Sequence, residues 1–446
     1  MKPFESGDRV AFFGDSLTHA GSYHRFIRNY YFTRYPGIDL KTFNCGNGGD
    51  SARGALFRMD FDLFNFQPNK VYVLFGMNDV DRYCYGTDHP DPQNLANREA
   101  ALKIYAESME TLVRRLQDAE MEEIVLISPT PYEEEAVMEE VNLKGTFRAL
   151  HRCMEINERL AERYGCSTVD LLNPMLELNR RMRETNPSAS LAGPDRVHPT
   201  TLGHAVMAYW ILRAQKVPKN VFSVTLGLAP TMENCAVSDL QMDGENLQFH
   251  LLPFSMPYPP FPEEEAVNRL VPFRKELCAM PLAVRGLADG CYELAVDGAF
   301  CCKASAGELA EGVDLALSSP KSEKIGELNL RYQQQEMKLR EIMKVEVALR
   351  ERKIALEVRG AIQSYMSAFL EEVKDKPWYS YYRNLFGSYF ALKAEVPEIV
   401  TSMRIISEEL VADPKPIDRL ITLRRCPEGF ARGGGGEKKC GVLTSL

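Results

Sequence analysis

Ser16 stands where a serine can act as a nucleophile. It follows the short apolar run at residues 10–13 and comes directly after Gly14 and Asp15. Such a run is typical of a buried parallel strand, and open α/β folds bind ligands at the carboxyl ends of such strands. A nucleophilic serine needs a base and a group that orients the base, and donors must receive the charge that develops on the substrate oxygen.

The segment at residues 195–198, DRVH, contains a pair suited to that support. An aspartate three residues before a histidine in a turn can accept a hydrogen bond from the Nδ1 of that histidine. Of the seven histidines, only His198 has an aspartate at this offset in a loop that leads into an expected helix, at about 200–215. His19, just after Ser16, either lines the pocket or has a structural role.

Two further loops follow expected strands and carry hydrogen-bond donors. Residues 44–52, NCGNGGDSA, are rich in glycine, which allows tight turns and a close approach of the backbone to a ligand. Residues 76–79, GMND, end the apolar strand expected at 70–75. Because the carboxyl ends of parallel strands meet at one edge of a sheet, these loops and Ser16 could border one cleft.

In this order the four segments resemble the sequence blocks of the SGNH (GDSL) hydrolase superfamily. Residues 14–17 read GDSL, Gly49 lies in GGDSA, residues 76–79 read GMND, and residues 195–198 read DRVH. Further similar phrases lie at residues 156–165, 169–171 and 198–204. The resemblance covers roughly residues 5–215, and it depends on all four blocks together because a lone GDSL would be weak evidence.

The resemblance implies a Ser-His-Asp triad on a flavodoxin-like parallel sheet flanked by helices. Ser16 would be the nucleophile, His198 the base and Asp195 the carboxylate that orients the base. The mechanism would be acyl transfer to Ser16, followed by hydrolysis by water that His198 activates. No metal and no organic cofactor is implied.

The resemblance also implies an oxyanion hole. Its donors would be the backbone N–H of Ser16, the backbone N–H of Gly49 and the side-chain amide of Asn78. Gly46 and Gly48 lie close enough in sequence to replace Gly49 in this role. Asn78 could instead cap a helix.

Strands and helices alternate in the part of the chain that must position these groups, as in βαβ units. The strands are expected at residues 9–13, 39–43, 70–75, 123–128 and 167–170. Helical spacing of apolar residues is evident over 101–116 and 150–164. This pattern predicts an α/β fold, with a parallel sheet between helices, in a catalytic domain at residues 1–218.

A small β-rich domain is expected at residues 219–318, and a sandwich of two sheets is one form that it could take. Helical periodicity is weak there, and proline, glycine and short alternating runs are frequent. Residues 291–305 predict a hairpin around Asp297 and Gly298, which favour a type I′ turn. Further strands are expected at 247–252 and 282–285.

Residues 319–426 are expected to form a helical hairpin and an aromatic segment. Apolar side chains recur at three- and four-residue steps from Ile325 to Leu356, with polar interruptions at Gln335, Glu346 and Lys353. This seam packs on its own chain or joins a second copy, so a homo-oligomer through these helices is one possibility.

The aromatic run at residues 378–390, WYSYYRNLFGSYF, has two open interpretations. Its rings fill a core or, if they lie close to Ser16, stack on sugar rings of a substrate. Residues 427–446 contain four successive glycines and are expected to be a disordered tail.

Composition excludes several classes of function. The 446 residues have a net charge of -9 and no concentrated basic stripe, which argues against nucleic acid or an anionic membrane as partner. The first residues run directly into a strand, and no apolar run is long enough to span a bilayer, so a cytoplasmic protein is expected. The eleven cysteines include no CxxC pair, which favours reduced thiols over a disulfide framework or a zinc site.

We therefore expect a serine esterase that acts on short-chain esters, with acetylated carbohydrate as the preferred substrate class. Within the superfamily, the chain is most similar to bacterial carbohydrate esterases that remove acetyl groups from oligosaccharides. A lipase, lysophospholipase or thioesterase acting on longer acyl chains is the alternative enzyme. A carbohydrate-binding or assembly protein is the alternative of another class, and the complete triad argues against it.

Overall fold

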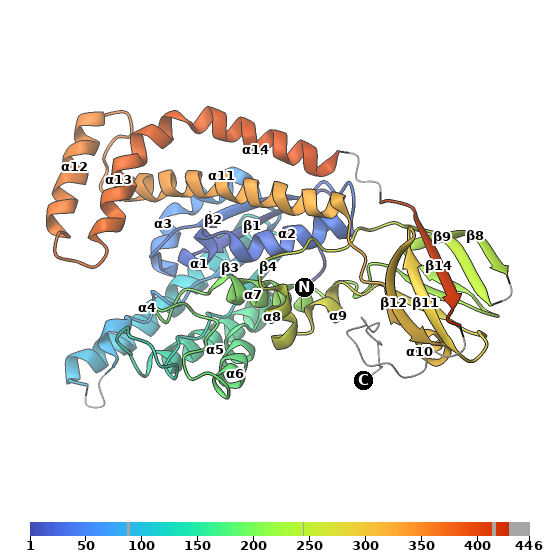
Figure 1. Cartoon of the computed structure of the whole chain (residues 1–446). Helices are drawn as coiled ribbons and strands as arrows, with labels where there is room; N and C mark the ends of the chain where they lie inside the picture. Colours follow the sequence, from blue (N-terminus) through green and yellow to red (C-terminus); the bar gives the residue numbers. More distant parts are fainter. Residues whose placement is uncertain (87–89, 244, 413–415, 428–446) are drawn as a thin grey trace. The chain divides into compact units, whose positions relative to one another are not determined.

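A computed structural model describes residues 1–86, 90–243, 245–412 and 416–427 of the chain (Figure 1). The chain divides into two compact units. The first unit holds Met1–Arg28, Asp39–Lys216 and Asn329–Glu409, and the second holds Asn29–Ile38, Val217–Leu328 and the chain from Leu410 on. Most of the helical segment expected at 319–426 therefore belongs to the same unit as the expected catalytic domain. From residue 428 on, the expected tail lies outside the described residues.

A five-stranded parallel sheet forms the centre of the first unit, as the sequence predicts. Its order is β2-β1-β3-β4-β5, the flavodoxin-like order. The strands are β1 (Arg9–Gly14), β2 (Lys41–Gly46), β3 (Lys70–Leu74), β4 (Glu123–Ile127) and β5 (Ser167–Val169). In the sheet β1 has β2 on one side and β3 on the other, so the chain crosses from one side of β1 to the other between β2 and β3. The loops after β1 and β3 therefore lie at the point where the strand order reverses, which is where such sheets bind ligands.

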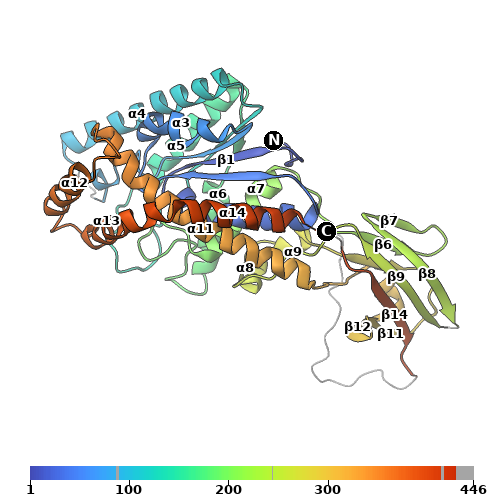
Figure 2. The same ribbon diagram turned by 90° about the horizontal axis from the view of Figure 1, so that it is seen from above.

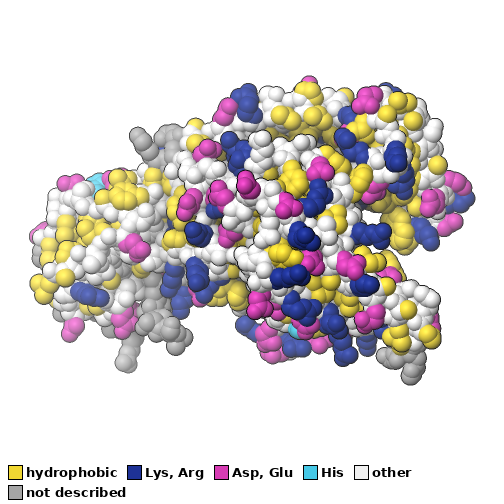
Figure 3. All heavy atoms as spheres, turned by 180° about the vertical axis from the view of Figure 1, so that it is seen from behind, with side chains coloured by type: hydrophobic (Ala, Val, Ile, Leu, Met, Phe, Trp, Pro, Cys, Tyr) yellow, Lys and Arg dark blue, Asp and Glu magenta, His cyan; other side chains and the backbone are white. Residues whose placement is uncertain are grey.

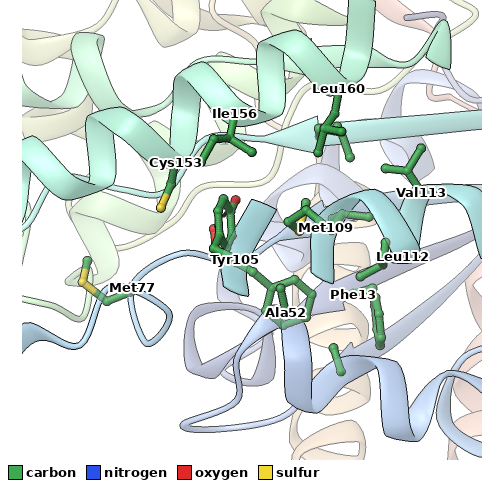
Figure 4. Close-up of a cluster of buried hydrophobic side chains, with 14 of the residues drawn as sticks. Phe13, Ala52, Met77, Tyr105, Met109, Leu112, Val113, Cys153, Ile156 and Leu160 are labelled. Carbon is green, nitrogen blue, oxygen red and sulfur yellow. Dashed lines mark hydrogen bonds between the residues drawn. The ribbon is translucent and has the colours of Figure 1, made fainter. Parts of the chain in front are cut away.

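Helices cover both faces of this sheet. They are α1 (Ser16–His19), α2 (Ser22–Arg34), α3 (Ala52–Asp62), α4 (Pro92–Asp118), α5 (Thr146–Tyr164), α6 (Leu172–Arg183) and α7 (Thr201–Ala214), with short 3₁₀ turns η1 (Phe64–Phe66) and η2 (Arg82–Cys84). Successive side chains of a strand point to opposite faces. Phe13 of β1 therefore joins the buried cluster with α3, α4 and α5 (Figure 4), whereas Phe12 packs on Tyr23 and His24 of α2.

Four helices, rather than the expected hairpin, form the C-terminal helical segment. They are α11 (Pro320–Glu351), α12 (Arg359–Glu372), α13 (Tyr379–Ala394) and α14 (Val396–Val411). Figure 2 shows α14 running alongside α11. The expected seam is thus interrupted, because Lys353 and Leu356 lie beyond the end of α11.

The seam of α11 packs on its own chain. Its apolar side chains share a buried cluster with α12 and α13, made of Ile342, Val345, Leu349, Ile362, Met366, Leu385, Phe386 and Tyr389. Glu346, one of the polar interruptions, accepts a hydrogen bond from Lys393 of α13. Part of the aromatic run therefore fills a core, whereas Trp378 and Tyr381 each remain 41% exposed.

Arg340 fastens α11 to the parallel sheet. Its guanidinium donates to the carbonyl oxygens of Asn44 at 3.0 Å and Gly46 at 2.8 Å, at the end of β2. It also donates to both carboxylate oxygens of the fully buried Asp62 of α3, at 2.6 Å each. Arg58 donates to the same carboxylate at 2.6 Å. This buried network fixes α11 beside the loop that follows β2.

The second unit contains two β-sheets, as its composition predicts. One has the order β13-β10-β6-β7, and the other has the order β12-β11-β14-β9-β8. The strands are β6 (Ser223–Leu226), β7 (Thr231–Glu233), β8 (Cys235–Asp243), β9 (Asn246–Pro253), β10 (Pro281–Val284), β11 (Cys291–Val296), β12 (Ala299–Ser305), β13 (Val313–Asp314) and β14 (Arg419–Arg425). The short helices are α8 (Glu264–Leu270), α9 (Phe273–Leu277) and α10 (Ala306–Glu311).

The predicted hairpin is confirmed, and one strand was not expected. Asp297 and Gly298 have φ angles of 52° and 79°, as a type I′ turn between β11 and β12 requires. Strand β14 comes from the segment expected to be helical or aromatic, and it pairs with both β9 and β11. Its buried Ile421 and Leu423 alternate with more exposed polar residues, which is a strand pattern.

Two expectations from composition can be compared with the described part of the chain. Within it, no helix is long and apolar enough to cross a membrane. Nine cysteines are free thiols, in line with the expected reduced state. Cys302, however, is disulfide-bonded, which the odd and scattered cysteines did not indicate.

Candidate active site

Ser16 begins α1 directly after β1, with Asp15 as the residue that caps the helix. The Asp15 carboxylate accepts a hydrogen bond from the backbone N–H of Leu17 at 3.0 Å. Asn44 holds the other end of α1, because its amide donates to the carbonyl of His19 at 3.0 Å. A Cβ on Gly46 would lie 2.1 Å from the backbone nitrogen of His19, so only glycine permits this approach of β2 to α1.

The side chains of Ser16, His198 and Asp195 form one chain of hydrogen bonds. Nε2 of His198 lies 2.8 Å from the Ser16 hydroxyl, and Nδ1 lies 2.5 Å from a carboxylate oxygen of Asp195. Since Nδ1–H donates to the carboxylate, Nε2 is the acceptor and the serine hydroxyl is the donor. The side chains of His198 and Asp195 are 51% and 48% exposed, so the group is open to solvent and substrate.

Asp195 is held as a carboxylate by its own turn. Burial alone would raise its pKa, but hydrogen bonds from the His198 ring and from the backbone N–H groups of His198 and Val197 outweigh burial. Together they lower the pKa of Asp195 to about 2. The group that orients His198 therefore keeps its negative charge at any pH near neutrality.

Arg196, which the sequence motifs did not single out, fixes the turn at residues 195–198 to the segment that follows β4. It is buried, and its backbone has a φ of 65°. Its guanidinium donates to the carbonyl oxygens of Glu133, Ala136, Met138 and Glu140, at 2.9 to 3.1 Å, in the segment that follows β4. The position of Arg196 between Asp195 and His198 is evident in the sequence. The four carbonyl groups that accept its hydrogen bonds lie far from it in sequence, so only the fold reveals them.

The three expected oxyanion donors lie in the loops after β1, β2 and β3. Within the described residues, the backbone N–H groups of Ser16 and Gly49 donate no hydrogen bond, so they are available to a substrate oxygen. Gly49 has a φ of 79°, which favours glycine at this turn. The amide of Asn78 donates one N–H to the carbonyl of Asp50 at 2.9 Å, and its second N–H remains for a substrate.

The Asn78→Ala variant is expected to lower kcat about 10² to 10³-fold, because one donor to the developing oxyanion is lost. KM should change little, since the carbonyl oxygen of the bound ester carries less charge than the oxyanion. Steady-state kinetics with p-nitrophenyl acetate measures both quantities. Asn65→Ala, at an exposed asparagine in η1, is the control. A loss of less than threefold in the Asn78 variant would remove Asn78 from the hole.

Three buried carboxylates lie behind these loops. Burial raises the pKa of Asp15 to about 6 and that of Asp79 to about 7. Burial also raises the pKa of Asp50, against the opposing charge of Arg58 at 2.6 Å. One Asp79 oxygen accepts the backbone N–H of Ala52 at 2.8 Å, and among the described residues the other is buried without a partner.

The Asp79→Asn variant is expected to be more stable than the wild type at pH 8 and equally stable at pH 4. The folded protein keeps the proton of Asp79 up to about pH 7, whereas an unfolded aspartate loses it near 3.8. The folded state thus binds more protons between these values, and stability falls as the pH rises through them. The gain at pH 8 should reach at most about 4 kcal/mol. Urea unfolding at both pH values measures it, and an equal gain at pH 4 would contradict this origin.

Within the ranges that the structure describes, no group of three or more histidine, cysteine, aspartate or glutamate side chains could hold a metal ion. His19, which had two open interpretations, is buried, and its Nε2 lies 3.3 Å from a carboxylate oxygen of Glu341 in α11. Burial lowers the pKa of His19, so this contact is chiefly structural.

Comparisons with known proteins relate part of the chain to ester hydrolases. Residues 10–211 match the family model described as GDSL-like lipase/acylhydrolase. An acetylxylan esterase from Geobacillus stearothermophilus is 25% identical over 225 residues, which cover 47% of this chain and 94% of that protein.

Two solved structures differ in how much of the chain they match. The structure titled BT4096, a gut microbial diltiazem-metabolizing enzyme, is 29% identical, with a TM-score of 0.84 over 96% of this chain and 99% of that one. The crystal structure of Axe2, an acetylxylan esterase from Geobacillus stearothermophilus, is 23% identical over 49% of this chain and 97% of its own, with a TM-score of 0.40.

The protein is a serine ester hydrolase with similarity to carbohydrate esterases, and residues 10–211 resemble the SGNH (GDSL) superfamily in their sequence blocks, their sheet order and their family match. The match to the diltiazem-metabolizing enzyme extends over both units. The β-rich unit and the C-terminal helices are therefore part of an architecture shared with at least one other enzyme.

Proposed function

We propose that the protein removes acetyl groups from carbohydrate esters, with Ser16, His198 and Asp195 as its catalytic triad. The observation that carries the proposal is the hydrogen-bond chain from Asp195 through His198 to Ser16, at the carboxyl edge of the parallel sheet. The similarity to an acetylxylan esterase supports the acetyl group and the sugar.

In this reaction the Ser16 hydroxyl gives its proton to Nε2 of His198 as its oxygen attacks the ester carbonyl. The resulting oxyanion accepts hydrogen bonds from the N–H groups of Ser16, Gly49 and Asn78. When this tetrahedral intermediate collapses, its bond to the alcohol oxygen breaks, and the alcohol takes the proton from His198. An acetyl group then remains on Ser16. Water then gives a proton to His198 as its oxygen attacks the carbonyl carbon of the acetyl group. The bond between that carbon and the Ser16 oxygen breaks, the Ser16 oxygen takes the proton back from His198, and acetate is released. Throughout, the charged Asp195 stabilises the imidazolium.

The alcohol part of the substrate need not be a polymer. The relative that matches 96% of the chain is described as metabolizing diltiazem, which is a small molecule. The triad is about half exposed, so a small ester and the acetylated unit of an oligosaccharide both have access to Ser16.

A panel of p-nitrophenyl esters is the first test of the proposed acyl group. We expect acetyl esters to be cleaved faster than butyryl esters, and octanoyl esters hardly at all. The reason is the polar character of the loop after β2, where Asn47 and Asp50 lie close to Gly49 and offer no apolar wall to a long chain. Faster cleavage of the octanoyl ester would favour the lipase or thioesterase alternative.

The second part of the test concerns the alcohol. Acetylated xylan, mannan and pectin oligomers should release acetate, and diltiazem belongs in the same panel. Turnover of p-nitrophenyl acetate without release of acetate from any oligosaccharide would contradict the carbohydrate part of the proposal and leave the esterase assignment intact.

A further inference from the structure

The C-terminal helices bring a second group of side chains beside the oxyanion loop, and the reaction described above does not use them. Glu341 of α11 contacts His19, three residues after Ser16, as described above. The charge of Glu341 also acts on Tyr381 of α13, and it adds to the larger effect of burial in raising the pKa of Tyr381. Glu341 therefore interacts both with α1, which carries Ser16, and with the exposed Tyr381.

Lys344, one turn further along α11, lies against the loop itself. Its ammonium nitrogen is 3.1 Å from the point that a Cβ would occupy on Gly48, the residue before the oxyanion donor Gly49. The same nitrogen lies 4.5 Å from the ring centroid of Tyr381 and 5.3 Å from that of Tyr382. Two aromatic faces thus hold a positive charge next to the oxyanion hole.

Among the described residues, the ammonium group of Lys344 makes neither a hydrogen bond nor an ion pair, so its three N–H donors have no partner in that part of the chain. The two nearby acidic side chains have other partners, since Glu341 contacts His19 and Asp50 is paired with Arg58. Burial lowers the pKa of Lys344 to about 8, although the charges of Glu341 and Asp50 oppose the shift. A charge that is partly desolvated and unpaired favours an anion as its missing partner.

A second cation lies near the nucleophile. Arg82 of η2 is half-buried, and its charge acts on Asp15, whose pKa it helps to lower against the larger effect of burial. Within the described part of the chain, Arg82 also makes no ion pair. Figure 3 shows Lys and Arg side chains gathered along a hollow in the surface, between the end formed by α12 and α13 and the end formed by α4.

We propose that Lys344 and Tyr381 form a subsite for a carboxylate on the alcohol part of the substrate, so that acetyl esters of uronic acids are preferred. The acetyl group itself is small and uncharged, and the anionic group must therefore belong to the alcohol. Tyr381 supplies a face for the sugar ring, and Lys344 donates to the carboxylate. The inference rests on the proposed function, because it names the sugar on which that function acts.

The test compares two substrates that differ only in the carboxylate: the methyl glycosides of acetylated glucuronic acid and of acetylated glucose. We expect wild-type kcat/KM to be about tenfold or more higher for the glucuronate. Lys344→Met should remove most of this preference, chiefly through KM, and Lys344→Arg should restore part of it because the charge returns. Lys338→Met is the matched control on the same helix, where an exposed lysine pairs with Glu395; it should leave the preference unchanged.

Three outcomes would overturn the inference, and they differ from one another. Equal kcat/KM for the two sugars in the wild type would overturn this inference alone, and the proposed function would stand. Equal losses on both sugars in Lys344→Met would give Lys344 a structural role, which a lowered thermal midpoint of that variant would accompany. Hydrolysis of p-nitrophenyl acetate with no hydrolysis of either sugar would overturn the proposed carbohydrate specificity together with the inference.

Discussion

Replacing Ser16 with alanine is expected to lower kcat for p-nitrophenyl acetate about 10⁴-fold or more. The nucleophile is lost, and His198 and the oxyanion donors then have no oxygen to activate. Removal of a triad serine alone costs nearly as much as removal of the whole triad, because the three residues act as a unit. Steady-state and burst kinetics with the same preparation measure the loss.

The fold of the Ser16→Ala variant should be unchanged. The Ser16 hydroxyl contacts His198, and no other side chain of the described residues depends on it for a hydrogen bond. Ser188→Ala, at an exposed serine, is the matched control and should keep full activity. Retention of more than a few per cent of wild-type kcat by Ser16→Ala, with the control unaffected, would show that another group is the nucleophile.

Replacing Arg340 with methionine is expected to lower the free energy of unfolding of the first unit by about 3 to 5 kcal/mol. The substitution leaves the carboxylate of Asp62 buried with Arg58 as its remaining cation, and it leaves the carbonyl oxygens of Asn44 and Gly46 without their donor. A broken buried ion pair costs far more than an exposed one.

The measurement can be confined to the first unit. Both tryptophans of the chain, Trp210 and Trp378, belong to it, so urea unfolding followed by tryptophan fluorescence reports on this unit. Arg404→Met, which breaks an exposed pair with Glu408 in α14, is the control and should change stability by less than about 0.5 kcal/mol. A loss below about 1 kcal/mol in the Arg340 variant would mean that α11 is held to the sheet by its apolar face alone.

The grouping of the candidate site residues could be predicted from the sequence because the parts of the candidate site are local. Ser16, Gly49 and Asn78 each follow a short apolar strand by a few residues, and parallel strands end at a common edge. The offset of three between Asp195 and His198 fixes their contact within a single turn. The hairpin at Asp297 and Gly298 was predictable for the same reason, because its geometry is decided by two adjacent residues.

The features that the sequence did not predict depend on contacts between residues that are distant in sequence. Local patterns do not reveal the partners in such contacts. Arg340 pairs with Asp62 across 278 positions. Strand β14 is short and follows the helical segment, so its alternation of buried and exposed residues was not recognised in the sequence. Its pairing with β9 and β11 is evident only in the folded structure. The place of Lys344 beside Gly48 likewise depends on how α11 crosses the sheet edge, which the helical period alone does not determine.

The central claim, that Ser16 forms the acyl-enzyme, is tested most directly by covalent labelling. The protein is treated with a fluorophosphonate, which reacts with activated serines, and the modified peptide is identified by mass spectrometry. We predict a single adduct on the peptide that contains Ser16, formed in proportion to the loss of esterase activity and absent from the Ser16→Ala and His198→Ala variants. Full inactivation with the label on a different residue, or full labelling of Ser16 with activity retained, would contradict the account.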